Sequence, residues 1–340
     1  METVPKKVLA QYDIGAVKTT KLLSSGLIHR TFRVKATKGE FILQRLHPIL
    51  ASKEIAEDFF VVTTFLNDEG FLSPKCVLTK KLTVLAKDGK HVWRMQTFIS
   101  GNTFHKLEKP AMAAEAGRIF ARFHMTLDRL PYRFKSKKVL HETEKIFAAF
   151  KKTVAANRKK PLMDEVKEEV ELILKELPNL FLPKGLPMRA IHGDPKISNI
   201  LFDADDKAKT IVDLDTCNRR PILVEFGDAF RSWCGLKEDD PKNRFRLPIF
   251  KAAWKGYSQE AGKFLTKKEI SLIPQSVGLI TLELASRFLK DYFEDSYFGW
   301  DSKRYPSRRA HNLARARGQV ALYRDLKKKM RTVQSVIARS

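Results

Sequence analysis

The stretch that decides the fold begins at position 192 and reads His192-Gly193-Asp194-Pro195-Lys196-Ile197-Ser198-Asn199-Ile200-Leu201-Phe202-Asp203. A second stretch follows closely and reads Ile211-Val212-Asp213-Leu214-Asp215. Together they place carboxylate and amide side chains around a short loop and two expected strands. Oxygen-rich side chains grouped in this way can hold a metal-bound nucleotide beside a hydroxyl group, so the two stretches predict phosphoryl transfer to a hydroxyl.

Asp194 is the candidate catalytic base within this loop. The proline that follows it disfavours helical geometry, so Asp194 is expected in an extended or turn conformation, on a loop where catalytic groups commonly lie. A carboxylate there can accept the proton that a hydroxyl loses during transfer. Considered alone, an Asp that caps the following backbone explains the pattern equally well. His192 is expected to hydrogen-bond within the loop, and Lys196 to contact the transferred phosphate.

Asn199, Asp213 and Asp215 are the candidate groups for binding a metal-nucleotide complex. An amide oxygen is a hard, neutral ligand suited to Mg²⁺, although an Asn before a strand is often only a turn residue. The two carboxylates alternate along a strand predicted over 210–214, so they are expected to point to the same side. Adjacent negative charges raise one pKa or require a cation, and the competing explanation is a solvated edge strand.

The first hundred residues are expected to be mainly strand. Apolar alternation predicts strands over 31–35, 40–46, 82–86 and 91–98, with a tight Asp88-Gly89 hairpin turn. A helix is predicted over 52–67, with Ser52 as its N-cap. Before the first strand, a small-residue turn offers Ser25 and Gly26 as candidate phosphate contacts, although an ordinary turn is equally compatible. Arg45, with Lys35 as the alternative, is the candidate cation for the phosphates.

The remainder of the chain is expected to be mainly helical. Helices are predicted over 110–130, 141–156, 162–177, 225–236, 247–261, 267–294 and 307–335. One β-hairpin is set among them, over 199–202 and 210–214. The chain is therefore expected to have an α+β fold in two lobes, with a small nucleotide-binding lobe over 1–99 and a helical lobe over 100–340 that carries the catalytic loop and acceptor site. A cleft between such lobes is a natural ligand site.

Composition narrows the class of protein. The 340 residues are 43% hydrophobic and include 23 Phe, enough for a sizeable core. The three cysteines form no CxxC pair, which favours reduced thiols in a cytoplasmic protein. Neither a secretory signal nor an apolar run of membrane-spanning length is found, so no membrane association is expected.

The net charge of +25 permits binding to nucleic acid, and the basic C-terminal helix is the segment that would provide it. Lysine-rich solvated surfaces explain the charge more simply. The sequence contains no zinc-finger spacing and no RNP-like aromatic motif, so nucleic acid is not expected as a partner.

These residues resemble the aminoglycoside phosphotransferase and choline kinase superfamily, and most closely its N-acetylhexosamine 1-kinase branch. The superfamily resemblance rests on 192–215. The resemblance to the branch rests on two later stretches, Arg287-Phe288-Leu289-Lys290-Asp291-Tyr292-Phe293 and His311-Asn312-Leu313-Ala314-Arg315-Ala316-Arg317. The resemblance implies a protein-kinase-like bilobal fold.

The same resemblance implies roles for individual residues. Asp194 would be the catalytic base, Asn199 and Asp213 the magnesium ligands, and Gln96 and Phe98 part of the hinge that touches adenine. Asp228 and Arg231 are expected to brace the catalytic loop from a helix. Three positions depart from the common pattern: His29 replaces Asn, Gln44 replaces a phosphate-binding Lys or Arg, and Glu225 replaces Asp.

The sequence therefore predicts a kinase that uses ATP and Mg²⁺ to phosphorylate a hydroxyl of a small sugar, with the anomeric hydroxyl of an N-acetylhexosamine as the leading example. A kinase of an amino alcohol or aminoglycoside is the first alternative. Such cationic acceptors favour an acidic pocket, whereas Arg219 and Arg220 follow the expected metal strand. A nucleic-acid-binding protein is the more distant alternative.

Overall fold

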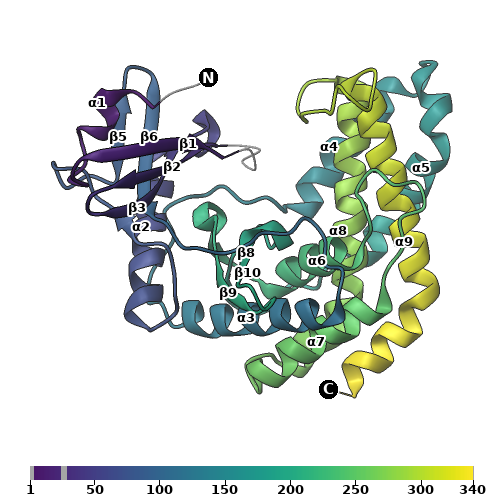
Figure 1. Ribbon diagram of the computed structural model, residues 1–340. Coiled ribbons are helices and arrows are strands. Elements are labelled where there is room, and N and C mark those ends of the chain that lie inside the picture. The colour runs from purple at the N-terminus through teal and green to yellow at the C-terminus, as the bar shows by residue number, and fades with distance from the viewer. Residues whose placement is uncertain (1–3, 24–28, 340) are drawn as a thin grey trace.

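The computed structural model describes residues 4–23 and 29–339. A small β-rich N-terminal part and a larger helical C-terminal part lie beside each other (Figure 1). The predicted α+β architecture is therefore confirmed. Ser25 and Gly26, the candidate phosphate contacts, fall outside the described residues.

A six-stranded antiparallel sheet forms most of the N-terminal part, in the order β1-β2-β3-β6-β4 with β5 paired to β6. Its strands are β1 (Val17–Leu22), β2 (Arg30–Ala36), β3 (Gly39–Arg45), β4 (Cys76–Val77), β5 (Leu85–Asp88) and β6 (His91–Thr97). The predicted hairpin turn between β5 and β6 is present, and Gly89 adopts a φ of +55° in it. One face of the sheet, called the outer face below, packs its apolar side chains with Val8 of helix α1 (Lys6–Leu9).

Helix α2 (Lys53–Asp68) packs between this sheet and the C-terminal part. It begins as predicted at Ser52, whose Oγ accepts a hydrogen bond from the backbone N–H of Ile55 at 3.3 Å. Its buried side chains Phe59, Val62 and Leu66 belong to the main core of the C-terminal part. The helix is therefore shared by the two parts.

Asp58 anchors α2 to the segment that follows helix α3 (Pro110–Asp128). Its carboxylate accepts hydrogen bonds from Oη of Tyr132 at 2.7 Å and from the backbone N–H groups of Lys135 at 2.9 Å and Ser136 at 2.8 Å. Asp58 is buried, so these three donors replace water around the charge.

The helices of the C-terminal part form two cores. They are α3 (Pro110–Asp128), α4 (Thr143–Asn157), α5 (Leu162–Glu176), α6 (Ile222–Cys234), α7 (Leu247–Ala261), α8 (Lys267–Glu294) and α9 (Arg308–Ala338). The larger core joins α3, α6 and α7 to the small strands of the catalytic region. The second core joins α4, α5, α8 and α9.

Local chemistry explains where these helices begin and how closely they pack. Helix α8 starts with a capping box, in which Oγ1 of Thr266 accepts from the N–H of Glu269 at 3.1 Å and the Glu269 carboxylate accepts from the N–H of Thr266 at 2.8 Å. Helices α3 and α7 touch at Gly117, where a Cβ would lie 2.0 Å from the carbonyl oxygen of Ala253. Helix–helix packing at this point therefore requires glycine.

Helix α9 uses part of its positive charge inside the molecule. Ion pairs join Arg317 to Glu169 at 3.0 Å and Lys327 to Glu176 at 2.8 Å, so α9 pairs electrostatically with α5. Within the described ranges, none of the helices has both the length and the apolar character needed to cross a membrane.

Two small antiparallel sheets carry the decisive stretches of sequence. The strand β7 (Met188–Ile191) pairs with β10 (Asn218–Pro221), and β8 (Ile200–Phe202) pairs with β9 (Ala208–Ile211). The segment after the large sheet reaches this region directly, because Asn102 forms an isolated bridge with Phe202. The connection between the two parts therefore ends beside the catalytic hairpin.

Candidate active site

A tight loop leads from β7 to the 3₁₀ turn Ile197–Asn199 and carries Asp194. Gly193 has a φ of +85°, and a Cβ at this position would lie 2.5 Å from the carbonyl oxygen of Thr216. Oδ2 of Asp194 lies 2.8 Å from Nζ of Lys196. Burial by itself lowers the pKa of Lys196, but the Asp194 carboxylate outweighs it and raises the pKa above its ordinary value. Lys196 therefore stays charged beside the candidate base.

His192 holds the loop and is not positioned as a base. Its Nδ1 accepts a hydrogen bond from the backbone N–H of Asp194 at 3.2 Å, while Nε2 lies 3.0 Å from the carbonyl oxygen of Val212. One acceptor and one donor suit the tautomer with hydrogen on Nε2. The imidazole is fully buried and bridges the loop to the segment after β9, in agreement with the structural role predicted for it.

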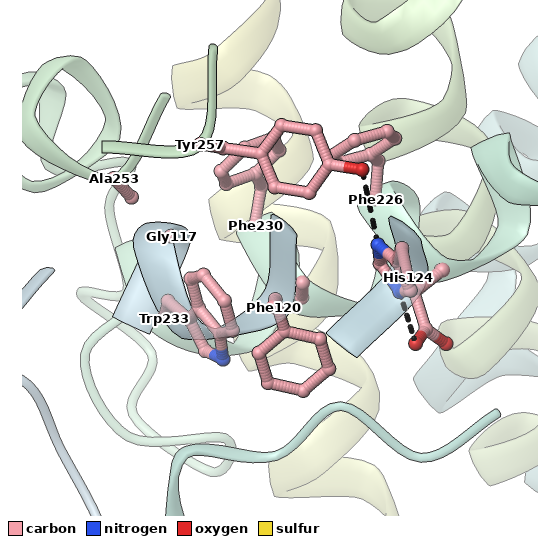
Figure 2. A pocket seen from close by; sticks show the side chains of 10 residues that line it. Gly117, Phe120, His124, Phe226, Phe230, Trp233, Ala253 and Tyr257 are labelled. Atoms are coloured by element: carbon pink, nitrogen blue, oxygen red, sulfur yellow. Dashed lines mark hydrogen bonds and ion pairs between the residues drawn. The ribbon is translucent and has the colours of Figure 1, made fainter. Parts of the chain in front are cut away.

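Glu225 of α6 supports the loop from behind. Its two carboxylate oxygens accept the backbone N–H groups of His192 and Gly193, each at 2.8 Å. Nε2 of His124 lies 3.1 Å from the same carboxylate, and Nδ1 of His124 lies 3.0 Å from Oη of Tyr257. Figure 2 shows the contact between His124 and Tyr257 at one side of an aromatic cluster. The longer Glu side chain thus performs the support that Asp commonly provides in the family pattern.

The cavity drawn in Figure 2 is a packing gap and not a substrate site. Its volume is about 10 Å³, and apolar rings such as Phe120, Phe226 and Phe230 line most of it. A space of this size holds at most one water molecule. The aromatic cluster therefore supports the catalytic loop by close packing.

Direct bracing of the loop differs in part from the prediction. Nε1 of Trp233 donates a hydrogen bond to the carbonyl oxygen of Pro195 at 2.8 Å, and no special role was predicted for this tryptophan. Asp228 and Arg231, which were expected to brace the loop, pair with each other at 2.6 Å. Asp228 also lies 3.8 Å from Nε2 of His141. Glu225 and Trp233 therefore provide the direct hydrogen bonds, and the Asp228–Arg231 pair forms a charged layer next to them.

Asn199 joins the loop to the segment that carries Asp213. Its Nδ2 donates to the carbonyl oxygen of Asp194 at 2.9 Å, and its own carbonyl accepts the backbone N–H of Val212 at 2.8 Å. The structure therefore brings together Asp194, Lys196, Asn199 and Asp213, which the sequence had proposed as one site.

The predicted strand over 210–214 is wrong at its end. Strand β9 stops at Ile211, and Asp213 has a left-handed φ of +67° that no strand residue adopts. Asp215 lies in the 3₁₀ turn Leu214–Thr216. The two carboxylates therefore do not share the face of a strand. Nevertheless, ligand atoms of His29, Asp213 and Asp215 all lie within 4.8 Å of one another.

Asp213 and Asp215 have different surroundings. Burial raises the pKa of Asp213, and the neighbouring carboxylates of Asp215 and Asp194 raise it further. For Asp215, burial raises the pKa, but Arg94 and His29 outweigh it and hold the pKa well below its usual range. Asp215 is therefore fixed as an anion by its partners, whereas Asp213 faces other negative charges.

The large sheet presents an inner face to this site, opposite its outer face. Gln44 of β3 and Arg94 of β6 are cross-strand partners, and Gln96 follows on the same side of β6. Arg45 pairs instead with Trp93, whose indole is buried in the outer core. Strand alternation therefore argues against Arg45 as the phosphate cation, and Arg94 is the arginine of β6 that faces the site.

Phe98 lies just after β6, at the predicted hinge. Its backbone N–H donates to the carbonyl oxygen of Glu40 at 3.0 Å, and the guanidinium of Arg33 lies 4.0 Å from the centre of its ring. The position beyond the inner face of the sheet is compatible with the predicted hinge.

The predictions from sequence omitted Arg94, His124 and Tyr257. Arg94 had a detectable signal, because it is a charged residue between the apolar Trp93 and Met95 of a predicted strand. His124 and Tyr257 lie on ordinary amphipathic helices, and only their meeting at Glu225 gives them a role.

Comparisons with known proteins agree with this arrangement. Residues 19–254 match the Phosphotransferase enzyme family, APH. A homoserine kinase from Bradyrhizobium diazoefficiens is 23% identical over 288 residues, which cover 83% of this chain and 80% of that protein. A homoserine kinase from Caulobacter sp. (strain K31) is 25% identical over 270 residues, covering 78% and 79%.

Solved structures resemble the chain over nearly its full length. The aminoglycoside phosphotransferase from Alicyclobacillus acidocaldarius has a TM-score of 0.67 at 13% identity and covers 98% of both chains. The amicoumacin kinase hAmiN, in complex with AMP-PNP and Ca²⁺, has a TM-score of 0.63 at 16% identity and covers 94% and 96%. These likenesses establish the fold, and they do not confirm the N-acetylhexosamine 1-kinase branch.

The matched residues, 19–254, run from β1 to the middle of α7. They therefore include the whole catalytic region described above. Since it covers more than half of the 340 residues, the chain belongs to the phosphotransferase enzyme family and is a small-molecule phosphotransferase.

Proposed function

We propose that the protein transfers a phosphoryl group from ATP, bound with Mg²⁺, to a hydroxyl of a small sugar, with the anomeric hydroxyl of an N-acetylhexosamine as the leading acceptor. The observation that carries this proposal is the junction of Asp194, Asn199 and Asp213. Two hydrogen bonds, from Asn199 to the Asp194 carbonyl and from Val212 to the Asn199 carbonyl, hold a base and two oxygen ligands on one rigid unit.

Asp213 and Asn199 fit a magnesium ion. The Asp213 carboxylate has no hydrogen-bond partner among residues 4–23 and 29–339, and like charges nearby raise its pKa. A cation at this carboxylate would remove that repulsion. Nδ2 of Asn199 is already used, which leaves the amide oxygen for the ion. Magnesium would neutralise charge on the phosphate oxygens, as in other phosphotransferases.

Asp194 is the proposed base for the acceptor hydroxyl. It stands on a loop whose backbone is held by Glu225, and its carboxylate is paired with Lys196 at 2.8 Å. The Asp194 carboxylate can accept the hydroxyl proton, and the neighbouring Lys196 ammonium can then interact with the transferred phosphoryl group. Rigid support places this carboxylate in advance, which is how such a site gains rate.

The inner face of the sheet is the proposed nucleotide side. Gln96 and Phe98 would border adenine, because they lie at the end of β6 where the chain passes toward the C-terminal part. Ser25 and Gly26 keep their proposed role as phosphate contacts. The AMP-PNP bound by the amicoumacin kinase, a protein of the same fold, supports ATP as the nucleotide. A cytoplasmic location accords with the three free cysteines.

The cation beside the proposed base favours an acceptor without net positive charge. The Lys196 ammonium lies 2.8 Å from Asp194, and Arg231 pairs with Asp228 at 2.6 Å. Glu238 and Glu283 add negative charge next to Arg231 and His141. An ammonium at the base would repel the cationic group of an amino alcohol, whereas a neutral sugar meets no such repulsion.

A second candidate acceptor is homoserine. The relatives from Bradyrhizobium and Caulobacter are named homoserine kinases, and their matches cover most of this chain. Homoserine is a zwitterion with no net charge, so the ammonium of Lys196 beside Asp194 does not exclude it. The two acceptors differ in size and in the charged groups that a pocket must bind.

A panel of acceptors tests the proposal. ADP release is measured with MgATP and, separately, N-acetylglucosamine, N-acetylgalactosamine, homoserine, choline and an aminoglycoside. We expect turnover with an N-acetylhexosamine. Turnover with homoserine alone would replace the sugar proposal by the second candidate, and turnover with choline alone would favour an amino-alcohol kinase.

Asp194→Asn tests the base. It should lower kcat by a factor of about 100 or more while nucleotide affinity changes little. The matched control is Asp205→Asn, which makes the same change on an exposed turn of the β8–β9 hairpin and should leave kcat unchanged. Equal turnover by Asp194→Asn and the wild-type protein would remove Asp194 from its role.

A further inference from the structure

We propose that Arg94 is a positioning residue for the metal site, which keeps the Asp215 carboxylate away from the divalent ion and leaves Asp213 as the single aspartate ligand. This inference rests on the proposed function, because it concerns how the same site is held. It assigns a role to a cation that the family pattern would have placed on β3, where this chain has Gln44.

Arg94 is fixed from three directions. Its Nη2 donates to Oε1 of Gln44 at 2.8 Å across the sheet, and its guanidinium lies 3.7 Å from the centre of the Phe59 ring on α2. Both guanidinium Nη atoms bond to the Asp215 carboxylate, with Nη2 at 2.9 Å from Oδ2. Arg94 is only 1% exposed, so solvent does not compete for these contacts.

Both oxygens of the Asp215 carboxylate are engaged by donors. Arg94 binds both of its oxygens, and Nε2 of His29 lies 3.2 Å from Oδ2. His29 is itself held, because its Nδ1 accepts the backbone N–H of His47 at 3.1 Å. A carboxylate that pairs with a guanidinium in this two-pronged manner has little capacity left for a metal ion.

Asp213 differs in this respect, although it is only two residues away. It has no hydrogen-bond partner within the described part of the chain, and its ligand oxygen lies within 4.8 Å of a carboxylate oxygen of Asp215 and a ring nitrogen of His29. Two acidic groups at this separation would both bind a divalent ion if both were free. The pairing with Arg94 selects between them.

The ion pair between Arg94 and Asp215 also links the N-terminal and C-terminal parts of the molecule. Arg94 belongs to the large sheet, and Asp215 belongs to the 3₁₀ turn directly after Asp213. A rigid ion pair between them fixes the turn relative to the inner face of the sheet, where the nucleotide is proposed to lie. Arg94 therefore acts on the ion through Asp215 and does not touch it.

Binding of Mn²⁺ tests the proposal without using activity. The free ion is measured by electron paramagnetic resonance as it is titrated with protein, alone and with ADP. In Arg94→Met the Asp215 carboxylate is released next to Asp213, so we expect Mn²⁺ affinity to rise on the order of tenfold as a second charged ligand becomes available. A residue with a merely structural role would leave the affinity unchanged or lower it.

The double variant Arg94→Met/Asp215→Asn guards against failure to fold, because it removes both buried charges together. Since Asp215 is not a ligand in the wild-type protein, this variant should bind Mn²⁺ within about twofold of wild type and lack the gain of the single variant. A tenfold loss of affinity in the double variant would show that Asp215 itself binds the ion and would overturn the proposal.

A rescue variant and a control complete the experiment. Gln44→Lys in the Arg94→Met background supplies an ammonium from the neighbouring strand, and should return Mn²⁺ affinity toward that of the wild-type protein. Arg129→Met, which removes a surface partner of Glu69, should not change it. Absence of Mn²⁺ uptake by the wild-type protein, with or without ADP, would count against the proposed function itself. If the wild-type protein binds Mn²⁺ and Arg94→Met leaves the affinity unchanged, the result would count only against this inference.

Discussion

Nε1 of Trp233 donates a hydrogen bond to the carbonyl oxygen of Pro195 at 2.8 Å and so ties α6 to the candidate catalytic loop. Trp233→Phe keeps an aromatic ring but removes the donor and leaves the carbonyl unpaired. We expect a loss of about 1–2 kcal/mol in the free energy of unfolding, together with a lower kcat. Urea denaturation and the ADP-release assay measure the two effects.

A matched control is available for this change. Nε1 of Trp254 is buried without a hydrogen-bond partner within the described residues, so Trp254→Phe removes an indole N–H that bonds to nothing. It should cost less stability than Trp233→Phe and leave kcat nearly unchanged. Equal effects of the two variants would mean that ring size, and not the hydrogen bond, supports the loop.

Gly193→Ala should distort the loop beside Asp194. The residue has a φ of +85°, and its new Cβ would lie 2.5 Å from the Thr216 carbonyl oxygen. We expect kcat to fall by a factor on the order of 100, because misplacement of a catalytic group by about 1 Å has this effect. Gly185→Ala is the control, since Gly185 has a similar φ of +74° with nothing within 4 Å of its Cβ. A similar kcat for both variants would contradict the steric argument.

His141 should make the stability of the protein depend on pH. Burial by itself lowers the pKa of His141, but Glu283, at 2.7 Å, and Asp228 raise it from 6.5 to about 9. A raised pKa in the folded state gives a contribution that is complete below pH 6.5 and is lost as the pH rises through about 9. The shift corresponds to at most about 3 kcal/mol.

The measurement is the free energy of unfolding between pH 6 and 10, compared with that of His141→Gln. The difference between the two proteins should shrink over the window from about 6.5 to about 9. His105→Gln, which alters an exposed histidine, should run parallel to the wild-type protein. A constant difference between wild type and His141→Gln across this range would contradict the assignment.

Asp291 and Asn312 join the two late stretches that carry the resemblance to the N-acetylhexosamine 1-kinase branch. The Asp291 carboxylate accepts Nδ2 of Asn312 at 2.8 Å and the backbone N–H groups of Ser296, Tyr297 and Phe298. It therefore fixes the connection between α8 and α9. Asp291→Asn replaces a charged acceptor by a neutral one, and should reduce the free energy of unfolding by about 1–3 kcal/mol, as measured by thermal or urea denaturation.

Asp301→Asn provides the comparison for that change. Asp301 lies in the same connection, but its carboxylate accepts only the backbone N–H of Lys303, at 3.0 Å, within the described chain. The loss of stability should be clearly smaller than for Asp291→Asn. The two family stretches meet at a structural joint, so the resemblance that they carry does not by itself identify an acceptor.

Much of the fold was predictable because it depends on local signals. Helices α7 and α8 have the predicted bounds, and Ser52 caps α2 as expected. Periodicity and capping residues act over a few positions and are visible in the sequence. The strand expected over 210–214 failed at its end. After Ile211, the backbone of Val212 bonds to Asn199 and His192, and Asp213 has a left-handed φ.

The site was predictable in its residue types and not in its partnerships. Asp194, Asn199 and Asp213 lie close together in the sequence, so their grouping could be expected. The pairing of Arg94 with Asp215 spans 121 positions, and that of His124 with Glu225 spans 101. Such pairs are set by how sheet and helices pack. No spacing in one sequence reveals them.

The anchoring of α2 by Asp58 has a consequence for how the enzyme can be controlled. In protein kinases, the equivalent helix moves to make or break an ion pair with the sheet and so switches activity. In this protein the carboxylate of Asp58 on α2 is bound by donors within 132–136. The sheet cation Arg94 is paired with Asp215, and not with an acid from α2. A helix that is anchored to the C-terminal part in this way is not free to switch activity by moving relative to it. We expect an enzyme whose turnover follows the supply of nucleotide and acceptor.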